Sequence, residues 1–237
     1  MKILALDSSG LTASVAVVEE DILVGEYTIN YKKTHSQTLL PMLDQVAEEI
    51  ELDLNTIDYI AVAAGPGSFT GLRIGSATAK GLGLALKKPL VHIPTVDALA
   101  YQFYGTDKII CPLMDARRNQ VYTGIFCFQG EEFIILQPQC AVSIEEILEK
   151  VNKQGREAVF LGDGVPVYLE KIKELVKVPY FLAPAHRSRQ SAAAAAVLAQ
   201  QYIKQGKTET AAEHMPDYLR LSQAERERLE KEKEASL

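Results

Sequence analysis

Apolar and polar residues follow the same order twice along this chain. In the first block, three apolar or β-branched runs are separated by the turn sequences Asp7-Ser-Ser-Gly10 and Glu19-Glu-Asp21. Such runs, bounded by turn residues, predict three short strands joined by tight turns. Apolar residues then recur at helical spacing, and a fourth apolar run leads into a glycine-rich turn. The predicted elements are strands at 3–6, 12–18, 22–29 and 59–64, helices at 36–51 and 70–86, a short strand at 90–93 and a helix from residue 95.

The second block starts near residue 106 and repeats this order. Its first apolar run ends in Asp115, which takes the place that Asp7 holds in the first block. Ser143 is a predicted N-cap for the helix that follows the third strand, and a fourth strand closes at Gly162-Asp163-Gly164. The predicted elements are strands at 108–114, 120–128, 133–142 and 158–161, and helices at 144–151 and 188–205.

An internal duplication of three antiparallel strands followed by α/β units is a fold-level signal. It predicts an α/β, two-lobed ribonuclease H-like fold, the actin-like ATPase architecture of actin, sugar kinases and heat-shock ATPases. We expect an N-terminal lobe over 1–105, a C-terminal lobe over 106–220 and a charged tail over 221–237. A nucleotide lies between the lobes in that architecture, but a fold alone does not establish an activity.

Composition and charge narrow the function further. The 237 residues are 47% hydrophobic and carry a formal net charge of −6, which disfavours a free-standing nucleic-acid binder. The three cysteines, Cys111, Cys127 and Cys140, lie in strand-like runs and are interpreted as reduced core residues. No apolar run approaches the length of a membrane span and no signal sequence is visible. These observations predict a cytoplasmic protein without membrane contact.

The glycine-rich segment GPGSFTGLRIG (residues 65–75) has the position of a phosphate-binding turn but not its chemistry. A Walker A loop needs Lys and then Ser or Thr directly after its last glycine, whereas Gly71 is followed by Leu72-Arg73 and Lys80 lies far along the helix. The spacing also fails the dinucleotide fingerprint. A strand, a glycine turn and a helix start still indicate that some backbone approaches closely.

The helix at 70–86 points to a protein as that close neighbour. Glycine inside a helix costs about 0.5–1 kcal/mol relative to alanine, so several glycines indicate tight packing. A narrow polar stripe of Arg73, Ser76, Lys80 and Lys87 leaves an apolar arc too wide for one core. We therefore predict a sheet on one side and a partner on the other; the alternative is that the chain's own domain covers the helix. The predicted interface residues are Gly71, Ile74, Gly75, Thr78, Ala79 and Leu82.

Specific motifs resemble one known family over nearly the whole chain. They are the start Ile3-Leu-Ala-Leu-Asp-Ser-Ser9, the pair His35-Ser36 before Leu39-Leu-Pro41, GPGSFTGLRIG running into Ala77-Thr-Ala-Lys-Gly81, Met114-Asp-Ala-Arg-Arg118, Gly162-Asp-Gly164 and Pro216-Asp-Tyr-Leu-Arg220. This set is similar to the TsaB (YeaZ) family. The resemblance implies a non-catalytic, dimerising subunit that acts with TsaD and the ATPase TsaE in adding threonylcarbamoyl to tRNA adenosine.

The resemblance further implies that helices 36–51 and 70–86 pack against the equivalent helices of TsaD, and that the chain alone forms a homodimer. tRNA is then bound only indirectly, through the complex. TsaD holds its metal with an H-x-x-x-H pair, and those positions fall on Thr95 and Leu99 here, which are poor ligands. The histidines, His35, His92, His186 and His214, show no pair at helical spacing. The sequence therefore predicts no catalytic residue and no metal site.

Nucleotide binding by the chain alone is the main alternative. Asp7 matches the aspartate that serves a magnesium-bound nucleotide in ribonuclease H-like ATPases, but its turn lacks a lysine or a glycine run to hold phosphates. Gly162 and Gly164 are weak candidates for a second phosphate turn, where the Asp163 carboxylate disfavours an anion. We expect no cofactor of its own, with ATP or ADP only in the complex. An ATPase or small-molecule kinase using Asp7 and Asp115 stays open, whereas a peptidase lacks a visible catalytic set.

Overall fold

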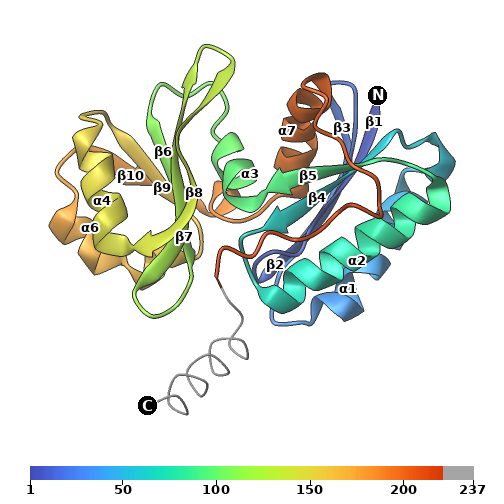
Figure 1. Ribbon diagram of the computed structural model, residues 1–237, viewed down its shortest axis with the longest axis horizontal. Helices are drawn as coiled ribbons and strands as arrows, with labels where there is room; N and C mark the ends of the chain where they lie inside the picture. Colours follow the sequence, from blue (N-terminus) through green and yellow to red (C-terminus); the bar gives the residue numbers. More distant parts are fainter. Residues whose placement is uncertain (221–237) are drawn as a thin grey trace, which may run out of the picture.

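Two mixed sheets of five strands each, with the same topology, form the frame of the molecule, and Figure 1 shows how they are arranged. The computed structural model describes residues 1–220 of the chain. The strand orders are β3-β2-β1-β4-β5 and β10-β9-β6-β7-β8. In each sheet three consecutive strands pair antiparallel, and two later strands extend the sheet in parallel from the first of them. The predicted duplication and the α/β, two-lobed ribonuclease H-like fold are confirmed.

The first sheet and its helices follow the sequence pattern closely. Its elements are β1 (Lys2–Asp7), β2 (Thr12–Glu19), β3 (Ile22–Asn30), α1 (His35–Glu49), the 3₁₀ turn η1 (Leu54–Thr56), β4 (Tyr59–Gly65), α2 (Phe69–Leu86), β5 (Leu90–Pro94) and α3 (Thr95–Tyr101). Nearly every residue of β2 is buried because helices cover both faces of the sheet there, whereas the edge strand β3 is largely exposed.

The second sheet contains the elements that the sequence pattern missed. Its elements are β6 (Ile109–Asp115), β7 (Gln120–Gln129), β8 (Glu132–Ser143), α4 (Ile144–Lys153), β9 (Ala158–Leu161), α5 (Gly164–Val167), α6 (Leu169–Leu175), β10 (Tyr180–Leu182), η2 (Ala185–Arg187) and α7 (Ala192–Lys204). Ser143 caps α4 as predicted, accepting a hydrogen bond from the Glu146 amide. The short elements α5, α6 and β10 were not predicted, because segments of three to seven residues carry too little periodicity.

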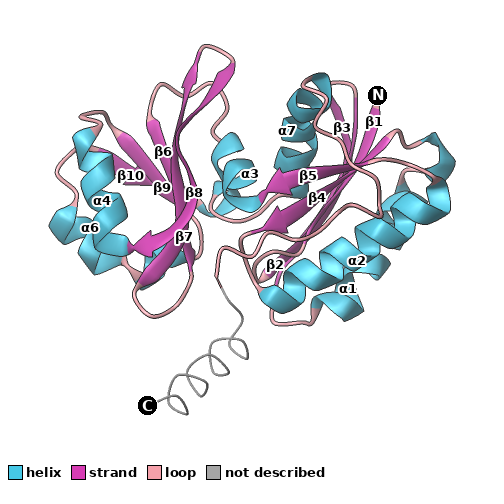
Figure 2. Ribbon diagram, in the orientation of Figure 1, coloured by secondary structure: helices cyan, strands magenta, loops and turns pink. Residues whose placement is uncertain are grey.

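Helices form three layers around the two sheets (Figure 2). Helices α1 and α2 cover the outer face of the first sheet, and α4 and α6 cover the outer face of the second. Helices α3 and α7 lie between the sheets, where one apolar core joins residues of both lobes. Four alanines of α7 are buried there, and their small side chains let the helix lie close to β1 and β2. The predicted C-terminal lobe over 106–220 therefore needs a correction, because α7 packs on the first sheet.

The segment after α7, which we call the C-terminal strap (residues 205–220), returns along the first lobe (Figure 1). Its backbone pairs with Leu90 of β5 through Glu209, and the Asp217 amide donates to the Ala64 carbonyl oxygen at 2.7 Å. Tyr218 stacks on Phe69 with ring centroids 4.7 Å apart. The predicted tail at 221–237 lies outside the described residues. Within the described part of the chain, no helix combines the length and apolarity needed to cross a membrane.

Candidate functional site

The glycine-rich segment packs against the turn between β1 and β2. The Ser68 amide donates to the Ser9 carbonyl oxygen at 2.7 Å. A Cβ at Gly67 would lie 2.2 Å from that same oxygen, and a Cβ at Gly71 would lie 2.0 Å from the Ser8 carbonyl oxygen. Only glycine allows backbones to approach this closely. The close approach indicated by the sequence is thus a contact between two backbone segments of this chain.

The inner face of α2 carries three of the six residues predicted to contact a partner. Gly71, Gly75 and Ala79 are buried, and a Cβ at Gly75 would lie 2.5 Å from Ser8 Oγ. Ser76, assigned to the polar stripe, is buried as well. This corrects the interface prediction for those three positions: the sheet and the β1–β2 turn occupy the space that the sequence pattern assigned to a partner.

The outer face of α2 is uncharged and accessible. The predicted interface residues Ile74, Thr78 and Leu82 are half-buried, and Ile74 and Leu82 pack against a core that includes residues of α1. From residue 74 to the end of the helix, the exposed positions are all small or apolar: Ala77, Gly81, Leu84 and Ala85. Leu84 exposes 65% of its surface, and Leu40 on α1 exposes 54%. We call these positions of the helix, Ile74, Ala77, Thr78, Gly81, Leu82, Leu84 and Ala85, the α2 ridge. A contiguous exposed surface without charge is typical of a protein contact site.

The strap and α1 leave the α2 ridge as the open side of the helix. Lys80 Nζ donates to the His214 carbonyl oxygen at 3.0 Å, and Arg73 Nε donates to the Tyr218 hydroxyl at 3.2 Å. These two cations of the predicted polar stripe are therefore held by the strap. Within residues 1–220, α2 contacts the sheet, α1 and the strap, and the α2 ridge is the side that these elements leave accessible.

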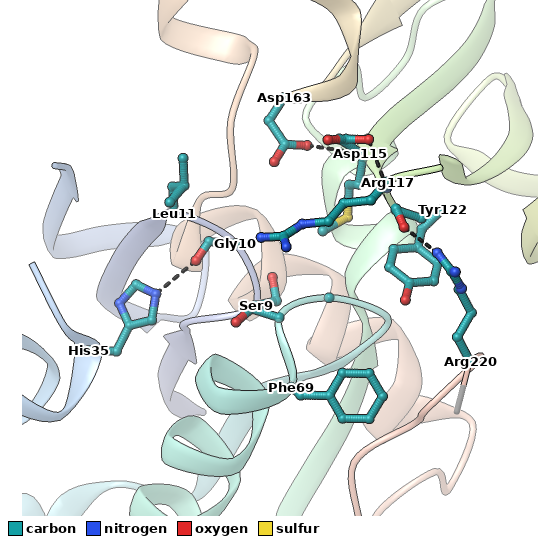
Figure 3. Close-up of a pocket in the computed structure, with 14 residues that line it drawn as sticks. Ser9, Gly10, Leu11, His35, Phe69, Asp115, Arg117, Tyr122, Asp163 and Arg220 are labelled. Carbon is teal, nitrogen blue, oxygen red and sulfur yellow. Dashed lines mark hydrogen bonds between the residues drawn. The ribbon is translucent and has the colours of Figure 1, made fainter. Parts of the chain in front are cut away.

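A second candidate site is the cleft between the lobes, of about 500 Å³ (Figure 3). Its lining residues are Ser9, Gly10, Leu11, His35, Gly67, Ser68, Phe69, Met114, Asp115, Ala116, Arg117, Tyr122, Asp163 and Arg220. Arg117 points from the β6–β7 turn toward Gly10 across the cleft (Figure 3). That turn holds three consecutive non-glycine residues with φ between 54° and 61°, Arg117, Arg118 and Asn119. Such backbone conformations are strained and cluster at functional sites.

Several polar groups of the cleft form hydrogen bonds that stabilise the turns lining it. Asp115 Oδ1 accepts from the Arg117 amide at 2.9 Å and from the Tyr168 hydroxyl at 3.1 Å. Asp163 Oδ1 accepts from the Asp115 amide at 3.1 Å, and burial raises the pKa of the Asp163 carboxyl. The Arg220 guanidinium donates to the Ala116 carbonyl oxygen, which joins the strap to the second lobe.

Gly162 and Gly164 are explained by packing. A Cβ at Gly162 would lie 2.1 Å from the Leu113 carbonyl oxygen, and a Cβ at Gly164 would lie 2.9 Å from the same atom. Gly162 also has a φ of +105°, which favours glycine. Both glycines bring the turn after β9 against β6, so their presence requires no phosphate ligand.

Asp7 lies beneath the cleft rather than in its lining. Its side chain is 1% exposed, and Oδ1 accepts from the amide and the hydroxyl of Ser9 at 2.9 and 2.7 Å. Oδ2 has no hydrogen-bond partner within the described part of the chain. Burial raises the pKa of this carboxyl to about 6, although both Ser9 bonds and the nearby His35 lower it. A buried carboxylate that costs stability is a common mark of a functional position.

Replacing Asp7 by asparagine is expected to stabilise the chain at neutral pH. The folded-state pKa of about 6 lies above the ordinary 3.8, so the native protein binds the extra proton between these values and its stability falls as pH rises through that window. Above pH 6 the ionised carboxylate of Asp7 lowers the free energy of unfolding by about 3 kcal/mol. The substitution removes this cost but places an unpartnered amide nitrogen near the Oδ2 position, so we expect a net gain of about 1–2 kcal/mol. Urea unfolding at pH 7.5 measures it.

The pH dependence of Asp7→Asn provides the internal control. Burial also raises the pKa of Asp97 to about 6, and that residue is unchanged in the variant. The loss of stability between pH 4 and 6 should therefore become shallower in Asp7→Asn without vanishing. An identical slope in the two proteins would show that Asp7 is not protonated in this window.

The residues at the positions of the H-x-x-x-H pair are buried between the lobes. Thr95, the first residue of α3, is 0% exposed, and Leu99, within the same helix, is 1% exposed. In contrast, His92 and His214 come together with ring centroids 5.8 Å apart, beside Glu209. Local sequence carries no signal for this pair, because it forms across β5 and the strap. Arg117 and Arg220 are likewise brought together at the cleft by tertiary structure alone.

Comparisons with known proteins give one matching family model and a set of similar relatives. A family model described as "TsaD: tRNA N6-adenosine threonylcarbamoyltransferase" matches residues 23–228. The tRNA threonylcarbamoyladenosine biosynthesis protein TsaB of Bacillus subtilis is 32% identical over 236 residues, covering 98% of this chain and 100% of that protein. TsaB of Escherichia coli is 29% identical, covering 93% and 95%. The solved structure of YeaZ from Pseudomonas aeruginosa superposes with a TM-score of 0.80 at 27% identity, covering 92% and 99%.

Proposed function

The chain belongs to the TsaB family of tRNA threonylcarbamoyladenosine biosynthesis proteins, and we propose that it is a scaffold subunit that binds and activates the catalytic TsaD subunit. The observation that carries this proposal is the α2 ridge, which is accessible, uncharged and built largely from small side chains. A helix face of this kind allows a partner helix to approach closely. TsaD is the partner that the family implies.

The match to a TsaD-type family model supports the geometry of this contact. Two chains that share a fold can pair through equivalent helices, in the way that identical subunits pair around a two-fold axis. We propose that α1 and α2 meet their counterparts in TsaD, and that in the absence of TsaD the same face forms a homodimer. TsaE is a further proposed partner, and the proposed location is the cytoplasm.

The residues at the candidate metal and phosphate positions support a non-catalytic role. The positions that correspond to the metal-binding histidines of TsaD hold Thr95 and Leu99, and both are buried. Asp115, Gly162 and Gly164 take part in turn packing. We propose that ATP or ADP binds only within the complex. With a net charge of −6, the chain contacts tRNA through the assembly and not by itself.

Stoichiometric association with TsaD tests the proposal. Mixing the purified chain with TsaD from the same source should give a one-to-one complex on size-exclusion chromatography with light scattering. The complex should also transfer threonylcarbamoyl to tRNA faster than TsaD alone. Independent elution of the two proteins at micromolar concentration would contradict the scaffold role.

The alternative is an ATPase or small-molecule kinase that uses Asp7 and Asp115. The observation in its favour is the interlobe cleft, whose volume and two arginines, Arg117 and Arg220, suit a small anionic ligand. Isothermal titration of the isolated chain with magnesium and ATP separates the two functions. The scaffold proposal expects no binding at micromolar concentration, whereas a tight one-to-one complex would favour the enzyme.

A further inference from the structure

Two histidines and a glutamate meet where the C-terminal strap crosses β5. His92 lies on β5, while Glu209 and His214 lie on the strap. Glu209 Oε1 is 2.6 Å from His214 Nδ1 and 3.8 Å from His92 Nδ1. One ligand atom from each of the three residues lies within 4.8 Å of the other two. This set is separate from the interlobe cleft and from the α2 ridge.

The donor set matches a transition-metal site. Two imidazoles and one carboxylate are a recurrent zinc environment, with bonds of about 2.0–2.2 Å and tetrahedral angles. Ligand atoms around such an ion are about 3.3 Å apart. The observed 2.6 and 3.8 Å distances from Glu209 Oε1 bracket this value.

The two ring nitrogens of His214 point in different directions, and Nδ1 is the one that faces Glu209. The His214 side chain is 0% exposed, and its Nε2 atom has no hydrogen-bond partner in the described part of the chain. A buried polar ring with an unsatisfied atom is costly and calls for a functional explanation. The unsatisfied Nε2 is not the atom that faces Glu209, so the case for a metal rests on the distances among the three residues.

Asp217 contacts the ring nitrogen of His92 that does not face Glu209. Its Oδ2 lies 3.0 Å from His92 Nε2, so a carboxylate engages this ring nitrogen while Nδ1 is the one that faces Glu209. A carboxylate that holds one ring nitrogen while the other faces an ion is the usual support of a metal-binding histidine. The sequence places Asp217 only three residues after His214, so one short segment supplies most of the site.

An ion has access to the site from solvent. His92 and Glu209 are 28% and 24% exposed, and with Asp217 they line a cavity of about 420 Å³ that also includes Tyr202 and Lys207. The charges nearby are mixed. Lys80 binds the His214 carbonyl oxygen, while the carboxylates of Glu209 and Asp217 favour a cation.

We propose that His92, Glu209 and His214 bind one divalent transition-metal ion, best matched by Zn²⁺, which fastens the C-terminal strap to β5. This departs from the sequence-based prediction of no metal site, which considered only ligands at helical spacing. The role is structural: the ion joins β5 to a segment that also holds Arg73 and Lys80 of α2.

Zinc titration of the full chain, free of any tag and stripped with chelator, tests the site. We expect one Zn²⁺ per chain with micromolar or tighter affinity, and a melting temperature that rises on adding zinc. Replacing a ligand in His92→Ala or Glu209→Gln should weaken binding about 100-fold, and Asp217→Asn about 10-fold. His186→Ala removes an exposed histidine elsewhere and should leave affinity unchanged.

Two results would overturn the proposal. One is the absence of zinc binding by the natural chain at micromolar concentration. The other is an unchanged affinity in both His92→Ala and Glu209→Gln, with both variants melting like the natural chain in the absence of metal. Cobalt substitution identifies the ligand type, because a strong near-ultraviolet thiolate band would assign the ion to the half-buried Cys140 instead. A weak visible spectrum of nitrogen and oxygen ligands is expected.

Discussion

Replacing Gly71 by valine is expected to lower the free energy of unfolding by about 3 kcal/mol or more. The new Cβ would lie 2.0 Å from the Ser8 carbonyl oxygen. That oxygen is part of the backbone, and the Cβ is bonded to the backbone, so neither atom can move away freely. Ser8 Oγ donates to the Gly71 carbonyl oxygen at 2.9 Å, so any shift that relieves the clash also lengthens this buried bond. Urea unfolding followed by circular dichroism measures the loss.

Gly81→Ala is the matched control on the same helix. A Cβ at Gly81 meets nothing within 4 Å, so alanine fits without rearrangement. Alanine in an exposed helix interior should stabilise the isolated chain by about 0.5–1 kcal/mol. Opposite signs for the two substitutions would establish that the inner and outer glycines of α2 serve different purposes. Equal losses would contradict the packing described for Gly71.

The glycine pattern illustrates how much the sequence could predict. The strand before it, the helix after it and the need for a close neighbour all follow from local residue types. The identity of that neighbour does not follow from local residue types. A glycine is needed whether the close neighbour is another subunit or, as here, Ser8 and Ser9 of the same chain. Helical periodicity also could not separate the inner face from the α2 ridge, since both consist of small or apolar residues.

Tertiary contacts account for the remaining differences. The alanine-rich helix α7 was predicted as an element, but its return to the first sheet depends on packing between lobes. The strap has no regular periodicity, so its path along α2 was not predicted, and the pairing of His92 with His214 depends on that path. Elements set by local pattern were therefore predictable, whereas sites assembled from distant segments were not.

Substitution of Ala77 by arginine is expected to abolish most binding to TsaD while leaving the fold intact. Ala77 is exposed on the α2 ridge, so the isolated chain can accommodate a long side chain. In the proposed complex the guanidinium would be desolvated against small apolar residues, at a cost of several kcal/mol. We expect the dissociation constant to rise about 100-fold, measured by isothermal titration, with a melting temperature close to that of the natural chain.

Val167→Arg is the control for this experiment. Val167 exposes 58% of its surface at the end of α5, in the second lobe and away from the α2 ridge, so the same charge added there should leave TsaD affinity unchanged. Ala77→Arg should also dissociate any homodimer of the isolated chain, because the proposal assigns both associations to one face. Full TsaD affinity in Ala77→Arg would exclude the α2 ridge as the interface. A loss of homodimer alone would assign the two associations to different surfaces.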